Sequence, residues 1–167
     1  MAKFELGVEL KLRGLFLEDP GKALTVFEEE FGKALDETSS LMLRKVDKYT
    51  PRGVTGNFAG SLFRERRGRG FGMQAVVGTP LQLQGSRLEE GIAYDPALPP
   101  LIEWARLKLG LETSHAFAVA KVIKRRISQS GMKNVARMFQ KGFNEGRPMA
   151  QKILDKAARR IAIRWGQ

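Results

Sequence analysis

A long amphipathic helix over residues 20–48 constrains the fold of this chain more than any other segment. Asp19 and Pro20 mark its start, because aspartate is a favoured N-cap and proline fits the first helical position. Pro51 marks its end, because the residue before a proline avoids the helical region. The apolar side chains recur at helical spacing and predict one buried stripe, which holds Leu24, Phe27, Phe31, Leu35, Met42, Val46 and Tyr49.

A basic β-hairpin is predicted after this helix and after a loop over residues 51–57. Two strand-like runs, at about 58–66 and 71–79, flank a Gly-rich tip, Arg66-Arg67-Gly68-Arg69-Gly70. The glycines at 68, 70 and 72 form a G-x-G-x-G run, but a phosphate-binding loop needs a helix directly after it. Here a strand follows, so a hairpin turn is the favoured interpretation.

The N-terminal residues 1–18 predict a short extended arm. From Phe4 to Leu12, apolar and polar residues alternate with period two, as in a strand with one buried face. Such an arm could add a strand to the sheet of a neighbouring copy. No apolar run approaches the ~20 residues of a membrane span, and the first residues show no secretory signal.

The remaining elements complete an α+β fold. We expect a small antiparallel β-sheet, with the basic hairpin packed against the long helix, and a helical C-terminal part. Residues 80–98 are expected to be irregular, with a third strand at 87–93. The C-terminal helices are predicted from Pro99-Pro100 to Gly110, from Thr113 or Ser114 to about 128 with a stop at Gly131, and from Pro148 onward. One domain over 1–167 is predicted, made of the arm (1–18), a helix-plus-sheet part (19–98) and a mainly helical part (99–167).

The composition excludes several kinds of chemistry. The chain has no Cys and one His, His115, so disulfides, thiolate nucleophiles and sulfur-based zinc sites are impossible. Glu89 and Glu90 are adjacent, and on a strand they would point to opposite faces, which makes a poor acid–base pair. The aspartates show no metal-loop spacing. We therefore predict no enzyme activity, no cofactor and no metal.

The charge of the chain is high and uneven. The formal net charge is +11, with −2 on residues 1–50 and +13 on residues 51–167. This asymmetry favours a polyanionic partner or an acidic face of a neighbouring protein, while a solvated basic surface is an equally open alternative. The cluster Lys121, Lys124, Arg125 and Arg126 lies beside an apolar stripe; a solvated helix face is favoured there over a membrane-surface helix. The candidate interface or DNA-channel residues are Arg64, Arg66, Arg67, Arg69, Glu89, Glu90, Lys121, Lys124, Arg125 and Arg126.

The order of the motifs resembles a known family. The long helix runs into Thr50-Pro51, and the segment Thr55-Gly56-Asn57-Phe58-Ala59-Gly60-Ser61 follows. After the basic hairpin come Val76-Val77-Gly78-Thr79, then Leu88-Glu89-Glu90-Gly91, then a Pro-led helix with Leu101-Ile102-Glu103-Trp104-Ala105, and finally Arg147-Pro148. Over residues 20–165 this set resembles the tail-component family of long-tailed bacteriophages, the tail-completion or head–tail joining proteins of the neck. The family's aromatic element before Glu-Gly is replaced here by Leu81-Gln82-Leu83-Gln84.

The resemblance implies a structural virion protein without enzyme activity. Its copies would form a ring around the DNA channel, commonly sixfold. The partners would be a tail tube or tail terminator protein, head connector or adaptor proteins, and viral DNA contacted without sequence readout; no membrane is involved. The protein would reside in the host cytoplasm during assembly and in the virion neck afterwards. The alternative is a nonspecific, basic nucleic-acid-binding protein that acts as a monomer or dimer.

Overall fold

The computed structural model describes residues 15–52, 56–132 and 136–166. Its elements are the helices α1 (Leu15–Glu18), α2 (Pro20–Tyr49), α3 (Asn57–Gly60), α4 (Gln82–Glu90), α5 (Leu98–Leu109), α6 (Thr113–Ser130) and α7 (Met138–Arg164), and the strands β1 (Phe63–Arg67) and β2 (Gln74–Gly78). The predicted α+β class is confirmed, with one small antiparallel sheet and a predominance of helix.

The chain divides into two compact units that interleave in sequence. One unit contains residues 49–62 and 79–139, which we call the α5–α6 unit. The other contains the described residues up to 48 together with 63–78 and 140 onward, which we call the α2–α7 unit. Neither unit is a continuous stretch of chain. The expected single domain over 1–167 stays a prediction.

The long helix of the α2–α7 unit forms as the sequence predicts. The side chain of Asp19 accepts a hydrogen bond from the backbone N–H of Lys22 at 3.0 Å, which is the expected N-cap. The helix then runs without a break to Tyr49 and ends before Thr50-Pro51. Most of the predicted stripe is buried, including Phe27, Leu35, Met42 and Val46.

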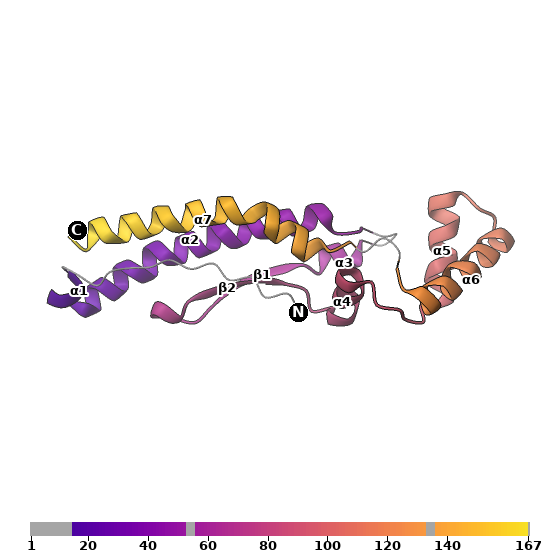
Figure 1. The fold of residues 1–167 in the computed structure, drawn as a ribbon, viewed down its shortest axis with the longest axis horizontal. Coiled ribbons are helices and arrows are strands. Elements are labelled where there is room, and N and C mark those ends of the chain that lie inside the picture. The colour runs from indigo at the N-terminus through magenta and orange to yellow at the C-terminus, as the bar shows by residue number, and fades with distance from the viewer. Residues whose placement is uncertain (1–14, 53–55, 133–135, 167) are drawn as a thin grey trace. The chain divides into compact units, whose positions relative to one another are not determined.

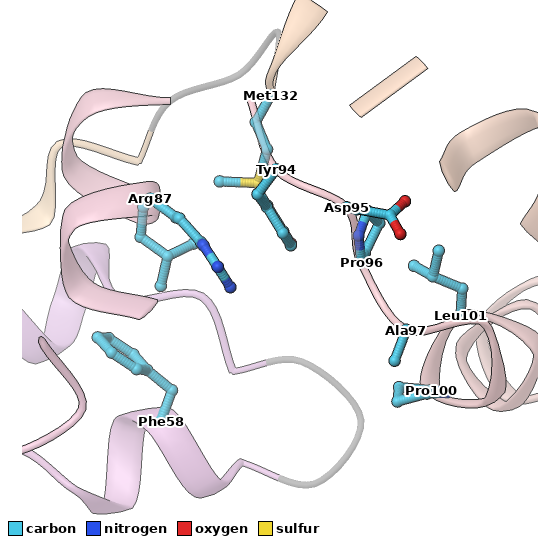
Figure 2. Close-up of a pocket in the computed structure, with 10 residues that line it drawn as sticks. Phe58, Arg87, Tyr94, Asp95, Pro96, Ala97, Pro100, Leu101 and Met132 are labelled. Atoms are coloured by element: carbon cyan, nitrogen blue, oxygen red, sulfur yellow. The ribbon is translucent and has the colours of Figure 1, made fainter. Parts of the chain in front are cut away.

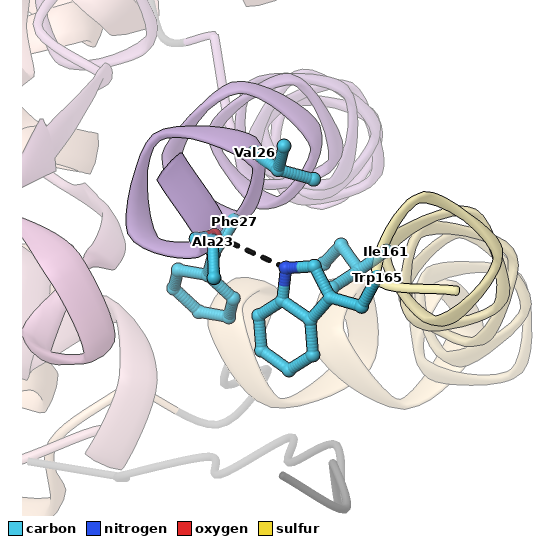
Figure 3. Packing of buried hydrophobic residues seen from close by; sticks show 5 residues of the cluster. All are labelled: Ala23, Val26, Phe27, Ile161 and Trp165. Carbon is cyan, nitrogen blue, oxygen red and sulfur yellow. Dashed lines mark hydrogen bonds between the residues drawn. The ribbon is translucent and has the colours of Figure 1, made fainter. Parts of the chain in front are cut away.

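Helix α7 lies antiparallel along α2, as Figure 1 shows. At one end of the pair, Ala23 and Phe27 of α2 pack on Ile161 and Trp165 (Figure 3). The indole N–H of Trp165, which is 1% exposed, donates to the carbonyl oxygen of Ala23 at 3.1 Å. Farther along, the buried cluster contains Ala34, Leu35, Leu154 and Ala157, and the last cluster contains Leu41, Met42 and Ala150.

Small residues of α7 bring the two backbones close together. A Cβ atom built on Gly142 would lie 2.7 Å from the backbone nitrogen of Val46 and 2.8 Å from its Cα. A Cβ atom on Gly146 would instead meet the Sδ atom of Met42 at 2.6 Å. The residue at position 142 therefore has to lack a side chain if the helices are to keep this separation.

The β-hairpin packs on the same pair of helices. Strand β1 pairs with β2 in an antiparallel register that sets Phe63 opposite Gly78 and Arg67 opposite Gln74. Partly buried Met73, Ala75 and Val77 cover the clusters of α2 and α7, so alternate residues of this run face the core. At the tip, Gly68 has φ +77° and Gly70 has φ +55°, which favour glycine. The predicted hairpin is thus confirmed, with shorter strands.

The α5–α6 unit is built mainly from short helices. Helix α5 ends at Gly110, which has φ +65° and is the predicted stop, and α6 ends before Gly131. The two helices pack on each other, and their buried residues are Ala105, Ala116 and Ala120. Trp104 of α5 is half-buried.

Several sequence predictions are wrong in detail. Residues 15–18 of the expected extended arm form a helical turn, whereas Phe4–Leu12 lie outside the described residues. Helix α3 takes up residues 58–60 of the first expected strand, and a 3₁₀ turn over 70–72 takes up residues 71–72 of the second. The helix predicted from Thr113 or Ser114 begins at Thr113, and the residue at its N-cap position is Glu112.

The expected third strand at 87–93 is wrong, because residues 82–90 form helix α4. The end of this helix is held by residues far along the chain. The N–H of Arg137 donates to the carbonyl oxygen of Leu88 at 3.1 Å, and the N–H of Met132 donates to that of Gly91 at 3.3 Å. Gly91 ends the helix in the left-handed conformation, with φ +69°.

Pro148 does not open the last helix, which begins ten residues earlier at Met138. Proline inside a helix removes one backbone hydrogen bond and costs about 3 kcal/mol. Helix α7 continues through it because Gly142 and Gly146 on one side, and Ala150 and Leu154 on the other, all pack against α2. Tertiary packing therefore outweighs the local helix-breaking tendency.

Candidate interaction surfaces

Two of the predicted hairpin arginines bind to helix α2 of their own chain. An Nη atom of Arg64 donates to the backbone carbonyl oxygen of Asp36 at 3.2 Å and lies 3.5 Å from the Oγ atom of Ser39. Arg66 forms an ion pair with the carboxylate of Asp36 at 3.3 Å. These contacts fasten β1 to α2, so Arg64 and Arg66 have an intramolecular role that the sequence did not indicate.

The other two hairpin arginines differ from each other. Arg67 pairs with Glu65 of the same strand, so its charge is partly neutralised. Arg69 is exposed, and within the described part of the chain it has no hydrogen-bond or ion-pair partner. The tip itself is held by Glu28, whose carboxylate accepts the backbone N–H of Gly70 at 2.7 Å.

The acidic residues 28–30 also bind other residues of the same chain. Arg160 donates to Glu30 at 2.7 Å, and Arg164 contacts Glu29 at 3.0 Å and Glu30 at 3.2 Å. The hydrogen bond from Arg160 lowers the pKa of the Glu30 carboxyl below its usual value, and partial burial of that carboxyl opposes the shift. Glu28, Glu29 and Glu30 therefore all have partners within their own chain.

Glu89 and Glu90 lie at the end of α4 and have different surroundings. The carboxylate of Glu89 accepts the backbone N–H of Phe139 at 3.0 Å, near the start of α7. This satisfies one of the N–H groups that the first turn of a helix leaves without an intrahelical partner. Glu90 is exposed. Glu89 thus stabilises the α5–α6 unit, and Glu90 is the one of the two that faces solvent.

The basic cluster of α6 is split between paired and solvent-facing side chains. Lys124 forms an ion pair with Asp95 at 2.9 Å, and that hydrogen bond, aided by one from Ser128, lowers the pKa of Asp95. The ammonium of Lys121 lies 4.5 Å from the centre of the Phe117 ring. Arg125 and Arg126 are exposed and have no partner within the described part of the chain.

The outer sides of α5 and α6 carry large exposed apolar residues. Leu107 is 62% exposed and Val122 is 68% exposed. Each lies two positions after a buried alanine, Ala105 or Ala120, so each points about 200° away from the buried side of its helix. Leu109 and Phe117 are exposed as well. Such side chains are the kind that subunit association covers.

A shallow pocket of about 360 Å³ lies in the α5–α6 unit (Figure 2). Its wall contains the guanidinium of Arg87, which stacks on the ring of Tyr94 at 4.0 Å from the ring centre. Apolar side chains of Phe58, Met132 and Leu101 form much of the remaining wall. The sequence alone does not reveal this pocket, because its residues come from four separate segments.

The outer face of α7 carries three cations that were not among the candidates from sequence. Lys152, Lys156 and Arg159 are exposed, whereas Leu154 and Ala157 of the same helix are buried. Spacings of four and three residues place the cations in one row. The signal was present in the sequence as basic residues opposite the apolar stripe of the last helix.

Two motif segments of the family resemblance meet in the α5–α6 unit. The hydroxyls of Ser61 and Thr79 lie 2.8 Å apart in a hydrogen bond, and Ser61 also donates to the carbonyl oxygen of Phe58 at 2.7 Å. Thr79 in turn accepts the N–H of Leu81 at 3.1 Å. The serine of the first segment thus fixes the end of the second, while Thr55 lies outside the described residues.

In the residues that the structure describes, no three His, Asp or Glu side chains converge in a way that could hold a metal ion. His115 is exposed near the start of α6. In the described segments, no helix is long and apolar enough to cross a membrane. Comparisons with protein families, with curated proteins and with solved structures found no match to this chain.

Proposed function

We propose that this chain is a structural protein of the neck of a long-tailed bacteriophage, where it completes the tail and joins it to the head. Its copies assemble as a ring around the DNA channel, commonly sixfold. The ring contacts a tail tube or tail terminator protein on one side and head connector or adaptor proteins on the other. It forms in the host cytoplasm and remains in the virion.

The observation that carries this proposal is the exposed apolar surface of the α5–α6 hairpin. A two-helix hairpin whose buried residues are alanines has little core of its own. Leu107 and Val122 on its outer sides are available for contact with another subunit. The hydrogen bond between Ser61 and Thr79 adds support, because it gives a structural reason for two of the segments that resemble the family.

The experiment is a measurement of assembly with matched surface variants. Purified wild-type protein is expected to form rings in negative-stain images. The double variant Leu107→Ser/Val122→Ser is expected to keep its helical circular dichroism and to elute as smaller species. The control is Ile163→Ser, which changes a residue of similar exposure, 70%, on α7. If the double variant and the control assemble equally well, the α5–α6 surface is not an assembly surface.

The second candidate is a nonspecific nucleic-acid-binding protein that acts as a monomer or dimer. The observation in its favour is the set of exposed cations without partners in the described residues, such as Arg125, Arg126 and Arg69. Salt-dependent affinity for any duplex, from a protein that sizes as a monomer or dimer at all concentrations, would favour this function over the ring.

A further inference from the structure

We propose that the outer face of α7, formed by Lys152, Lys156 and Arg159, is the surface that contacts duplex DNA. This inference deepens the function proposed above and rests on it, because a ring around DNA needs one surface that meets the phosphates. The ligand class is the phosphate backbone of a duplex, bound without base readout.

The three cations form a row whose length suits a phosphate backbone. Positions 152, 156 and 159 lie within about 60° of one another around the helix, on the side opposite Leu154 and Ile161. Along the axis they span about 10 Å, at 1.5 Å per residue. One strand of a duplex presents a phosphate about every 3.4 Å along its axis. The row therefore matches the length of about three phosphates.

These cations are available to a ligand, whereas others of the same helix are engaged. Arg160 and Arg164 are paired with Glu29 and Glu30. By contrast, Lys152, Lys156 and Arg159 have no hydrogen-bond or ion-pair partner among residues 15–52, 56–132 and 136–166.

The acidic residues of α7 do not cancel this row. Asp155 accepts a hydrogen bond from the side chain of Gln151 at 2.9 Å. Glu145 is bound by Lys45 at 2.7 Å and by Lys48 at 3.0 Å. Even if the charge of Asp155 is counted against the row, the outer face remains net positive.

The residue types of the row suit a duplex that moves. DNA that passes through a ring has to slide, so the contacts must attract without fixing the duplex in one register. Lysine presents a compact, strongly hydrated charge on a flexible stem, while arginine forms two-point hydrogen bonds with phosphate. Two lysines and one arginine on a solvent-facing helix suit attraction of this mobile kind. The hairpin arginines Arg64 and Arg66 are less suited, because they bind to α2.

The test compares two triple variants of the full chain. Lys152→Gln/Lys156→Gln/Arg159→Gln neutralises the outer face of α7. Lys22→Gln/Lys33→Gln/Arg44→Gln removes the same number of positive charges from exposed positions of α2 and is the matched control. Affinity for a short, labelled duplex of mixed sequence is measured by fluorescence anisotropy between about 50 and 200 mM salt, where such binding weakens steeply.

The α7 variant is expected to lower the slope of log K against log salt by on the order of 2 to 3, at about 0.9 for each phosphate that is no longer neutralised. The control is expected to keep the wild-type slope.

Equal losses of affinity in the two variants would overturn the proposal, since total charge would then govern binding. Unchanged DNA binding by the α7 variant, with loss of head–tail joining, would also overturn it and would assign the face to an acidic protein neighbour. Negative-stain images of each variant report ring formation separately, so a missing ring is distinguishable from a missing DNA contact.

Discussion

Replacing Gly142 by alanine tests the close approach of α2 and α7. The added Cβ atom would lie 2.7 Å from the backbone nitrogen of Val46 and 2.9 Å from the carbonyl carbon of Lys45. Because both atoms belong to the backbone of α2, the helices have to move apart. Overpacking of this kind costs about 1–3 kcal/mol, and a backbone neighbour places the cost near the upper end. Alanine regains about 1 kcal/mol over glycine in helix propensity. The net expected loss is about 2 kcal/mol.

The matched control is Gly146→Ala, one turn along the same helix. There the added Cβ would meet the Sδ atom of Met42, the flexible part of a side chain that can turn away. The gain in helix propensity then offsets the contact, so this variant is expected to be as stable as the wild type or up to about 1 kcal/mol more stable.

The measurement is urea unfolding followed by circular dichroism, with a thermal scan as a second readout. A loss of about 2 kcal/mol corresponds to a fall in Tm of about 4–8 °C for a chain of this size. If Gly142→Ala equals or exceeds the wild type in stability, or if the two glycine variants cannot be told apart, the helices do not pack as closely as described.

In the Glu30→Gln variant, the free energy of unfolding is expected to fall less than in the wild type as the pH is lowered into the acid range. A carboxyl whose folded pKa is lowered contributes stability above its ordinary value of 4.5 and loses it as the pH falls through the lower folded value, so urea midpoints across this range report the change. Trp165→Phe leaves the carbonyl oxygen of Ala23 without its indole donor and is expected to cost about 1–3 kcal/mol, measured by urea unfolding; an unchanged midpoint would contradict the buried hydrogen bond. Replacing Arg64, Arg66, Arg67 and Arg69 together by Ser is expected to leave the helical circular dichroism intact and to reduce head–tail joining. Normal yields of infectious, tailed particles from that variant would reject a role for the hairpin in joining.

Local signals predicted the elements that depend on neighbouring residues. Asp19-Pro20, Pro51 and the apolar stripe sufficed for α2, because capping and the 3.6-residue period are local properties. Gly110 and Gly131 marked the ends of α5 and α6, since both adopt positive φ there. The hairpin was predicted from alternation on either side of a Gly-rich tip, and its strands are shorter because the turns at both ends use more residues.

Elements that depend on distant contacts were not predictable in this way. Helix α4 is fixed by bonds from Met132, Arg137 and Phe139, which lie more than forty residues away in sequence. The continuity of α7 through Pro148 depends on its packing along α2. The same limit applies to the candidate sites. The sequence shows which residues are basic, but only the fold shows that Arg66 and Lys124 are paired while Lys152 faces solvent.

The most direct test of the proposed ring is the assembly state of the purified full-length protein. Mass photometry and negative-stain images of one preparation give the mass and the form of the particles together. We predict rings with a central opening and a mass that is a multiple of the 18.7 kDa chain, near 112 kDa for six copies. Particles that remain at the mass of one or two chains over a wide concentration range, with no ring in the images, would contradict it.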